Sequence, residues 1–172
     1  MTYSLFPVHT KTGIEQRHII YQYRGDNHWL SNFWPCNVVL PAESDALPAM
    51  SFDNVENAYM AWKTTDQSVR VKIQGMTPGD AKKFSHTADF PLRNPYTDDM
   101  RIKIMAELVE QKFSVMNPEM LGKLLATEDA LLIEGNLHHD TFFGVDLEKG
   151  CGQNQLGRIQ MKVRDKRRLE LG

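Results

Sequence analysis

Apolar residues recur at helical spacing in several parts of the chain, most clearly within residues 51–63. The positions that repeat there are Val55, Ala58, Tyr59 and Trp62. A spacing of i, i+3, i+4 and i+7 places side chains on one face of an α-helix. Asp53 or Asn54 can cap this helix, because short polar side chains accept the free backbone N–H groups of a first turn. The pattern predicts a short capped helix with one apolar face.

One residue further along, the same spacing brings a carboxylate and an ammonium onto a second stripe, which we call the polar stripe. The positions are Glu56, Tyr59, Met60 and Lys63. Glu56 and Lys63 then lie two turns apart, roughly 10 Å along the axis at about 1.5 Å per residue. This span suits a ligand with a reactive centre at one end and a phosphate at the other. The alternative is that both charges are solvated, as most charged side chains are.

The remaining pattern predicts a helix-rich protein with a few short strands. Helices are expected over 66–75, 78–84, 98–113, 118–127 and 155–168, and strands over 19–23, 37–40 and 131–134. Residues 28–35 hold three aromatic side chains, and Pro35 disfavours a helix there. Residues 1–17 are unpatterned and are interpreted as an N-terminal arm before one domain, residues 18–172. Because strands and helices do not alternate, the expected fold class is α+β, mostly helical.

Composition narrows the classes of function. The formal net charge of -2 over 172 residues gives no electrostatic reason to expect a nucleic-acid or membrane partner. The basic residues near the C-terminus, within 162–168, complement a helix dipole and are interpreted as a solvated helix end. Cys36 and Cys151 are isolated, which argues against a disulfide framework or zinc site and favours a reducing, cytoplasmic location. We recognise no signal peptide and no apolar run of membrane-spanning length.

A glycine-rich segment runs from Gly135 to Gly157. A loop of this length inside a domain is usually functional or disordered, and its aromatic residues favour an ordered site. Gly144 and the later glycines allow backbone N–H groups to approach an anion closely. The helix expected to begin near Gln155 adds a partial positive charge. From glycine spacing alone, the segment is a weak candidate for an anion site.

Two acids in this part of the chain are candidates for chemistry. Asp140, beside Phe142 and Phe143, is either a site carboxylate or the cap of a turn next to core phenylalanines. Glu134 ends the expected strand, where an unpaired charge is costly to bury. It is therefore either a member of a structural ion pair or a third site carboxylate. The neighbouring histidines are adjacent in sequence and face opposite ways on a strand, so no metal site is predicted.

Eight short motifs follow one another between residues 20 and 168. They are Leu30-Ser31-Asn32-Phe33-x-Pro35, Glu56-x-Ala58-Tyr59-x-Ala61-x-Lys63, Thr77-Pro78-Gly79-x-Ala81-Lys82, Lys112-Phe113-x-x-x-Asn117-Pro118-Glu119, Leu124-Leu125-Ala126-Thr127, Glu134-Gly135-Asn136, Asp140-x-x-Phe143-Gly144-Val145 and Gly152-x-Asn154-x-Leu156-Gly157-x-x-x-Met161-x-x-Arg164. In this order and spacing the chain resembles the NADAR (YbiA-like) family. Any one motif is weak, whereas eight in succession are specific.

The resemblance implies a small, helix-rich α+β domain that hydrolyses N-glycosidic bonds to a ribose. It implies no metal and no other cofactor. Known substrates in the family are the unstable phosphoribosylamino-pyrimidine intermediates of riboflavin synthesis, and similar enzymes remove ADP-ribose from guanine bases of nucleic acid. The expected partner is therefore a small phosphoribosyl or ADP-ribosyl substrate, or ADP-ribosylated nucleic acid. The oligomeric state is left open.

The chain departs from the family pattern at three places. Asn57 stands where the family usually has histidine, and Phe143 stands where it usually has tryptophan. The Trp-Glu pair that commonly follows the leucine-arginine pair is absent, and Tyr96 is the candidate stand-in. The first two changes bear on the identity of the base more than on the reaction.

Cleavage at the ribose C1′ builds an oxocarbenium-like cation, so hydrolysis needs a carboxylate, an activated water and a proton for the leaving base. Our hypothesis is that Glu56 aligns the water and stabilises the cation. Asp140 then holds ribose hydroxyls or protonates the base, and both acids share one pocket.

Candidate substrate contacts are Trp34, Trp62 and Phe143 for stacking, Lys63 and Arg24 for phosphate, Gly144 for close backbone approach, and Asn32 and Asn154 for sugar or amide groups.

A different class of protein would use many of the same residues. A non-catalytic module that binds ADP-ribose or a nucleotide also needs aromatic and cationic side chains. The pairing of Glu56 with Asp140 favours the enzyme, because a module that reads an anionic ligand gains nothing from two nearby carboxylates.

Overall fold

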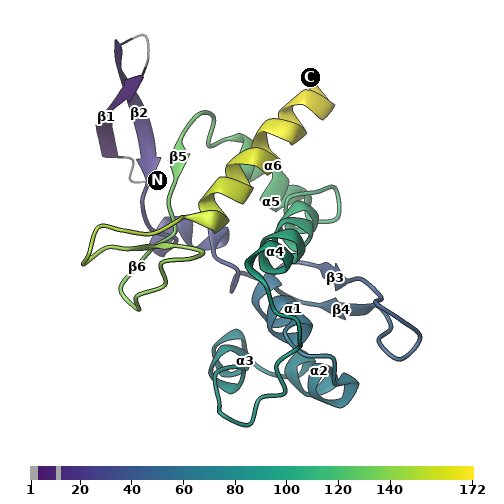
Figure 1. The fold of residues 1–172 in the computed structure, drawn as a ribbon. Coiled ribbons are helices and arrows are strands. Elements are labelled where there is room, and N and C mark those ends of the chain that lie inside the picture. The colour runs from purple at the N-terminus through teal and green to yellow at the C-terminus, as the bar shows by residue number, and fades with distance from the viewer. Residues whose placement is uncertain (1–3, 11–12) are drawn as a thin grey trace. The chain divides into compact units, whose positions relative to one another are not determined.

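The computed structural model describes residues 4–10 and 13–172, with side chains from His18 onward. Helices dominate, and the strands are few and short (Figure 1), so the fold class is α+β, as predicted.

The chain divides into two units. Residues 32–120 form one, which we call the helical unit. Residues 121–172 and the described residues up to Ser31 form the other, the split unit. Residues 1–3, 11 and 12 of the predicted arm lie outside the described residues.

The helical unit combines a short hairpin with four helices. Its elements are β3 (Val38–Leu40), β4 (Met50–Phe52), α1 (Val55–Trp62), α2 (Gln67–Gln74), α3 (Pro78–Phe84) and α4 (Asp98–Lys112). β3 and β4 pair antiparallel, with Val38 opposite Phe52. α1 packs against α2, α3, α4 and β3 (Figure 1), so it is the central element of this unit.

Each helix of this unit begins at a polar side chain that accepts a backbone N–H from its first turn. The caps are Asn54, Asp66, Thr77 and Thr97. Such a side chain satisfies one of the donors that a helix start leaves without an intrahelical partner. All four helices were predicted from sequence, because their caps and apolar spacing are local signals.

The split unit draws its elements from both ends of the chain. They are β1 (Ser4–Thr10), β2 (Gly13–Ile20), the 3-10 helix η1 (Gly25–Leu30), β5 (Leu131–Leu132), β6 (Gly135–Asn136), β7 (Val145–Asp146) and α6 (Gln155–Leu171). β1 pairs antiparallel with β2, and β2 pairs parallel with β5, placing Ile19 opposite Leu131. β6 and β7 form a second, parallel pair. α5 (Pro118–Leu125) crosses the boundary between the units.

Some elements differ from the sequence prediction. The strand expected over 19–23 is the end of β2, which stops at Ile20, and the backbone within the predicted arm pairs with it as a hairpin. η1 includes part of the aromatic segment expected to be non-helical. It begins at Gly25, whose φ of 55° is a left-handed conformation that glycine adopts readily. It ends at Leu30, before Pro35, which would break a helix. In α2, Arg70 is fully buried and Val69 only half-buried, so a charged side chain lies on the inward face of this helix.

Apolar side chains form the interior of both units. The most deeply buried are Leu40, Val55, Ala58, Ile73, Leu108, Val109 and Phe113 in the helical unit, and Ile20, Leu30, Leu124, Leu132 and Leu156 in the split unit. Burial of such side chains is the main favourable contribution to folding. No helix within the described residues is long and apolar enough to cross a bilayer.

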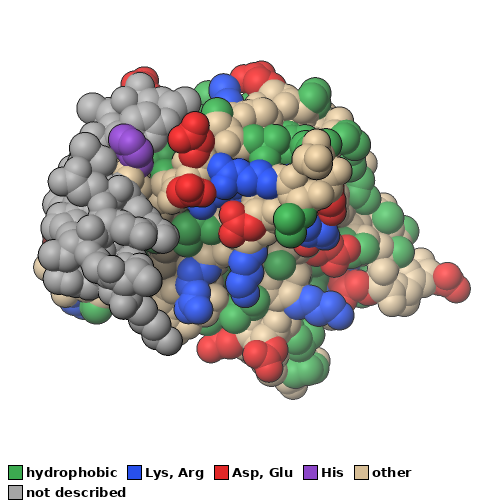
Figure 2. Space-filling view, turned by 90° about the horizontal axis from the view of Figure 1, so that it is seen from above, with side chains coloured by type: hydrophobic (Ala, Val, Ile, Leu, Met, Phe, Trp, Pro, Cys, Tyr) green, Lys and Arg blue, Asp and Glu red, His purple; other side chains and the backbone are tan. Residues whose placement is uncertain are grey.

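The basic end of α6 is paired with acids rather than collected into one positive surface. Arg167 Nη1 lies 2.6 Å from Glu170 Oε2, and Arg168 Nη1 lies 3.0 Å from Asp129 Oδ1. Figure 2 shows Lys and Arg side chains interspersed with Asp and Glu on the face that it presents. Arg167 and Arg168 agree with the interpretation of a solvated helix end. Arg164 does not, because it is buried and its Nη1 donates to Thr127 Oγ1 and to the Ala130 carbonyl, each at 2.9 Å.

Candidate functional site

α1 is buried on all sides. All eight residues from Val55 to Trp62 are buried, so the predicted apolar stripe and the polar stripe beside it are both covered. Of the two candidate caps, Asn54 serves, and its Oδ1 accepts the Asn57 N–H at 2.7 Å. The Asn57 amide in turn donates to the Met76 carbonyl at 2.7 Å and to the Ile73 carbonyl at 3.1 Å. Asn57, where the family usually has histidine, therefore ties α1 to the end of α2.

Glu56 and Lys63 are both buried, each with an exposed fraction of 6 %. The alternative that these charges are merely solvated is therefore wrong. The Glu56 backbone N–H donates to the Asn32 carbonyl at 3.0 Å, which fixes the start of α1 against the segment before β3. Burial of a charged group is costly unless other charges or hydrogen bonds compensate. The buried carboxylate of Glu56 and the buried ammonium of Lys63 therefore need compensation from neighbouring groups.

Lys63 lies at the C-terminal end of α1, where its Nζ donates to Ser85 Oγ at 3.1 Å. Burial lowers the pKa of Lys63 to about 8. Glu56 opposes this effect, whereas Arg101 and Lys82 lower the pKa further. The ammonium is therefore held among several charges, and it loses its proton more readily than an exposed lysine does.

Two tyrosines and an arginine meet beside α1. The Tyr59 and Tyr96 hydroxyl oxygens are 3.0 Å apart, and Arg101 Nε donates to the Tyr59 oxygen at 3.3 Å. The Arg101 guanidinium lies 5.5 Å from the centroid of the Tyr96 ring. Burial raises the pKa of Tyr59 well above its ordinary value, so its hydroxyl keeps its proton. Tyr96, the candidate stand-in for the missing family residues, thus contacts the polar stripe of α1.

Trp62, a predicted stacking surface for the base, already has ring contacts within the helical unit. The Arg93 guanidinium lies 4.1 Å from the centroid of the indole ring, and the Tyr59 ring stacks on it at 5.8 Å. Arg93 Nη2 is also 2.8 Å from Glu43 Oε1, and Arg70 pairs with the same carboxylate. Base stacking on Trp62 stays a prediction, and these contacts give the ring a structural role as well.

Two cavities of the helical unit lie near the ends of α1. One, of about 240 Å³, is lined by Leu40, Pro41, Glu43, Trp62, Arg93, Met100, Lys103, Ile104 and Glu107. The other is an open hollow of about 830 Å³ lined by Phe33, Pro35, Cys36, Asn37, Asp53, Asn54, Pro78 and residues 116–120. Of the predicted site residues, Trp62 lines the smaller cavity, and Glu56 lines neither.

The other predicted residues before α1 have different surroundings. The Asn32 side chain is buried, and its Nδ2 lies 3.5 Å from Met105 Sδ. Its Oδ1 is buried with no hydrogen-bond partner among the described residues. Trp34 is half-buried. Arg24 is exposed at the start of η1, in the split unit.

In the split unit, Asp140 caps a turn. Its Oδ1 accepts the backbone N–H groups of Phe142 at 2.9 Å and Phe143 at 3.1 Å. Phe143 is buried and meets Phe142 edge to face, with ring centroids 4.8 Å apart. The turn-capping alternative for Asp140 therefore describes the local geometry, and a catalytic role for this half-buried carboxylate stays a prediction.

Gly144 and Asn154 belong to a tightly packed part of the same loop. A Cβ on Gly144 would lie 2.5 Å from the Glu134 carbonyl oxygen and 2.7 Å from Glu134 Oε2, so this position requires glycine. Asn154 Oδ1 accepts the Glu134 N–H at 3.0 Å, and its Nδ2 donates to the Leu132 carbonyl at 2.9 Å. The Asn154 amide is therefore used to join the start of α6 to β5, and the Glu134 carboxylate lies against the glycine.

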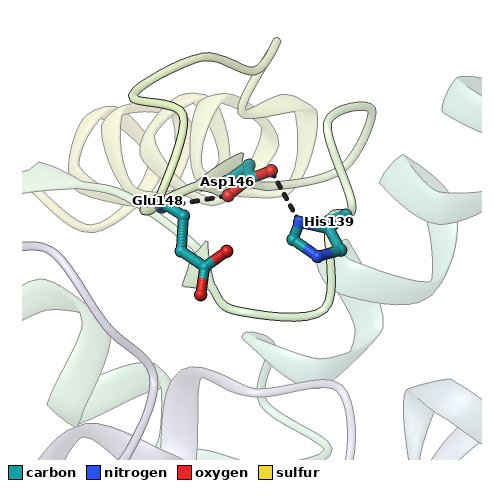
Figure 3. Close-up of side chains that lie close together, drawn as sticks. All are labelled: His139, Asp146 and Glu148. Carbon is teal, nitrogen blue, oxygen red and sulfur yellow. Dashed lines mark hydrogen bonds and ion pairs between the residues drawn. The ribbon is translucent and has the colours of Figure 1, made fainter.

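His139, Asp146 and Glu148 form a cluster that the sequence did not predict (Figure 3). Their candidate ligand atoms lie within 4.8 Å of one another. His139 Nδ1 is 2.8 Å from Asp146 Oδ2, and Asp146 Oδ1 accepts the Glu148 and Lys149 N–H groups at 3.0 and 3.3 Å. The hydrogen bond with His139 lowers the pKa of the buried Asp146. These bonds hold a turn, and the Lys149 ammonium, 3.9 Å from Asp146, disfavours a cation there.

Several charged residues near α1 were missed as site candidates. They are Glu43, Arg70, Lys82, Arg93 and Arg101. Their partners lie far away in sequence, so spacing along the chain carries little information about them. One available signal was the motif Thr77-Pro78-Gly79-x-Ala81-Lys82, whose lysine had no predicted role.

Comparison with known proteins defines the class of this protein. The NADAR domain model matches residues 20–168. The chain therefore belongs to the NADAR family, as the eight motifs predicted.

Two proteins illustrate the relationship. The chain is 33% identical over 149 residues to the riboflavin biosynthesis protein VVA0006 of Vibrio vulnificus strain YJ016, across 85% of this chain. It spans only 38% of the length of that relative. The NMR structure of the E. coli protein YbiA matches with a TM-score of 0.70 and 27% identity, covering 88% of this chain and 84% of YbiA. The fold is thus the YbiA fold.

Proposed function

We propose that this protein is an N-glycosidase that hydrolyses the bond between a ribose C1′ and a nitrogen of a base or amino-pyrimidine. The proposed substrates are phosphoribosylamino-pyrimidine intermediates of riboflavin synthesis or ADP-ribosylated guanine. Membership of the NADAR family and similarity to a protein named for riboflavin biosynthesis support this proposal. The two free cysteines, Cys36 and Cys151, support the further proposal of a cytoplasmic location.

The observation that carries the proposal is the buried carboxylate of Glu56 on α1, the helix at the centre of its unit. A rigid helix packed on several sides fixes the position of the carboxylate before substrate binds, and such preorganisation supplies much of the rate enhancement of many enzymes. In this role Glu56 stabilises the oxocarbenium-like cation and aligns the water that attacks C1′. Lys63, two turns further along the same stripe, contacts a substrate phosphate.

Asp140 is the proposed second acid. Its Oδ1 is engaged by the backbone N–H groups of Phe142 and Phe143, which fixes the carboxylate in place. The carboxylate then holds ribose hydroxyls or protonates the leaving base. Arg24 is proposed to contact phosphate, Trp34, Trp62 and Phe143 to stack on the base, Gly144 to allow close backbone approach, and Asn32 and Asn154 to contact the sugar or an amide.

The test is the substitution Glu56→Gln, which keeps the shape of the side chain. We expect folding to be retained and turnover to fall by on the order of 10²-fold or more, the size of a general acid–base contribution. Release of free base is measured with a phosphoribosylamino-pyrimidine and an ADP-ribosyl-guanine side by side. Gln153→Glu, at an exposed position outside the proposed roles, serves as a charge-changing control that retains turnover. Near-normal base release by Glu56→Gln removes Glu56 from the mechanism.

The second candidate is a non-catalytic module that binds ADP-ribose or a nucleotide. The observation in its favour is the turn-capping role of Asp140, because it explains that carboxylate without chemistry. Incubation of the purified protein with each ligand separates the two candidates. A binding module retains the ligand intact, whereas the proposed enzyme releases free base.

A further inference from the structure

Positive charges converge on the C-terminal end of α1 from three helices of the helical unit. Lys63 follows the last residue of α1, Lys82 lies in the last turn of α3, and Arg101 lies in the first turns of α4. Both helices pack against α1. Lys63 Nζ contacts Ser85, one turn beyond Lys82 at the end of α3, and Arg101 Nε contacts Tyr59, one turn before Lys63 on α1. We call Lys63, Lys82 and Arg101 the cation cluster.

The cluster is partly withdrawn from water. The exposed fraction of Lys63 is 6 %, and that of the Arg101 side chain is 22 %. Lys82 is half-buried, and its ammonium lies 5.9 Å from the centroid of the Phe33 ring. The Lys63 ammonium likewise lies 5.9 Å from the Phe90 ring. Aromatic rings and limited solvent make the repulsion among these cations stronger than it is on an open surface.

The repulsion contributes to the lowered pKa values of two groups here. Lys82 and Arg101 both lower the pKa of Lys63, and Lys63 and Lys82 both lower the pKa of His86, in each case after the larger effect of burial. The acids that act on the cluster are Glu56, which favours the charged form of Lys63, and Asp98, which lies 2.7 Å from Arg101. Cations placed so that they repel one another are stabilised when an anion binds between them.

The cluster also offers donors of the required kind. An ammonium has three N–H donors, and the hydrogen bonds described for Lys63 engage one of them, through Ser85. Ser85 itself donates to the Lys82 carbonyl at 2.9 Å, so it positions Lys63 rather than binding a ligand. Lysine point charges and an arginine fork are the side chains that bind phosphate groups in proteins.

We propose that Lys63, Lys82 and Arg101 form a binding subsite for the phosphate or diphosphate group of a phosphorylated ribose. This inference rests on the proposed function, which places the reacting sugar at Glu56, and it adds Lys82 and Arg101 to the substrate-binding residues. Glu56 and Lys63 are separated by two turns of α1, roughly 10 Å along the axis. The helix therefore separates the carboxylate that acts at C1′ from the charges that hold the phosphorylated end.

The experiment is a calorimetric titration of the full chain with ribose 5-phosphate, with ADP-ribose and with unphosphorylated ribose. The test variants are Lys82→Gln and Arg101→Gln. The matched controls are Lys83→Gln, the next residue on α3, and Lys72→Gln, exposed on α2. Thermal unfolding first verifies that each variant is folded. We expect each test variant to bind the phosphorylated compound roughly tenfold more weakly or worse, the effect of losing one charged hydrogen bond, and the controls to bind within about twofold of wild type.

The two phosphorylated ligands separate the two sources of phosphate. If the test variants bind ribose 5-phosphate more weakly than wild type does, the cluster binds a phosphate monoester. If they bind only ADP-ribose more weakly, the cluster binds a diphosphate. The subsite is overturned if ribose binds as tightly as either phosphorylated compound. It is also overturned if neither phosphorylated compound binds the folded wild type at millimolar concentration, or if the controls weaken binding as much as the test variants.

Failure of the proposed function gives a different result. If the wild type binds with the expected variant pattern but releases no free base, the subsite stands and the N-glycosidase proposal fails. If base release persists at the wild-type kcat/KM in Lys82→Gln and Arg101→Gln, the subsite fails and the N-glycosidase proposal stands. Glu56→Gln, in turn, is expected to keep its affinity for the phosphorylated ligand while it loses turnover.

Discussion

Around α1, the helical unit collects ionisable side chains that act directly on one another, such as Lys63 with Glu56 and Glu43 with Arg70 and Arg93. The loop from Gly135 to Gly157 in the split unit is held by glycines, side-chain amides and backbone groups, and its carboxylates Asp140 and Asp146 accept backbone N–H groups. The first arrangement depends mainly on pairs of opposite charges, whereas the second, apart from the pair of His139 with Asp146, depends on space and hydrogen-bond geometry. Substitutions that remove charge should consequently affect the helical unit most, and substitutions that add volume should affect the loop most.

The largest expected effect is that of Glu43→Ala. Arg70 is fully buried and Arg93 is 6 % exposed, so loss of their shared carboxylate leaves two buried guanidinium groups with only the Thr64 and Trp62 carbonyls as partners. Removing one partner of a buried ion pair costs about 3–5 kcal/mol of unfolding free energy, and because the Glu43 side chain is 30 % exposed we expect the lower figure, about 3 kcal/mol. Denaturant unfolding measures the change. Glu107→Ala, an exposed acid that lines the same small cavity, is the control and is expected to change stability by less than about 0.5 kcal/mol.

The same carboxylate makes stability depend on acid pH. Burial raises the pKa of Glu43, but hydrogen bonds from Arg93 and Arg70 outweigh it, and the net pKa lies below the ordinary value. Its contribution is therefore complete above the unfolded-state pKa of roughly 4.3 and is lost as pH falls through the lower folded-state pKa. The difference in unfolding free energy between wild type and Glu43→Ala should therefore become smaller as the pH drops below about 4. A difference that stays constant down to pH 2 contradicts the ion-pair explanation.

Gly144→Ala tests the loop through volume. The added Cβ would lie 2.5 Å from the Glu134 carbonyl oxygen and 2.6 Å from Asn136 Nδ2, so the backbone must shift. We expect a loss of about 2 kcal/mol in unfolding free energy, which is the usual cost of overpacking. Gly122→Ala is the matched control, because its Cβ meets no atom within 4 Å and alanine favours a helix. Equal stability of both variants would show that the loop is not tightly packed.

The smallest expected effect separates the two interpretations of Asp140. Asp140→Asn keeps an oxygen that accepts the Phe142 and Phe143 N–H groups, so stability should change by less than about 0.5 kcal/mol. If the carboxylate also acts on substrate, turnover falls by about tenfold or more, a change of roughly 1.4 kcal/mol in activation free energy. We expect this fall, and base-release kinetics with circular dichroism as a folding check measure it. Unchanged turnover leaves Asp140 with its turn-capping role alone.

Local signals in the sequence predicted most of the fold. The caps Asn54, Asp66, Thr77 and Thr97 lie immediately before the helices that they start, so their positions are readable from a few residues. β6 and β7 were missed because each has only two residues. Such strands leave no periodic pattern of their own.

For the candidate site, the sequence indicated α1 and its polar stripe but not the surroundings of that stripe. Helical spacing placed Glu56 and Lys63 on one face, and their burial follows from packing against other helices that spacing cannot show. Arg70 illustrates the same limit, because an arginine at an inward position is buried only when a carboxylate such as Glu43 reaches it. Hydrogen bonds of Asp140 and Asn154 likewise depend on loop geometry rather than residue type.

The parallel pairing of β2 with β5 has a consequence for how the chain assembles. Ile19 meets Leu131 only after the whole of residues 32–120 has been made, so this contact closes a long loop. Contacts of high sequence separation form slowly, because chain entropy is lost before they stabilise anything. During synthesis the inserted helices can therefore reach their folded state first, while the N-terminal hairpin waits for its third strand to leave the ribosome.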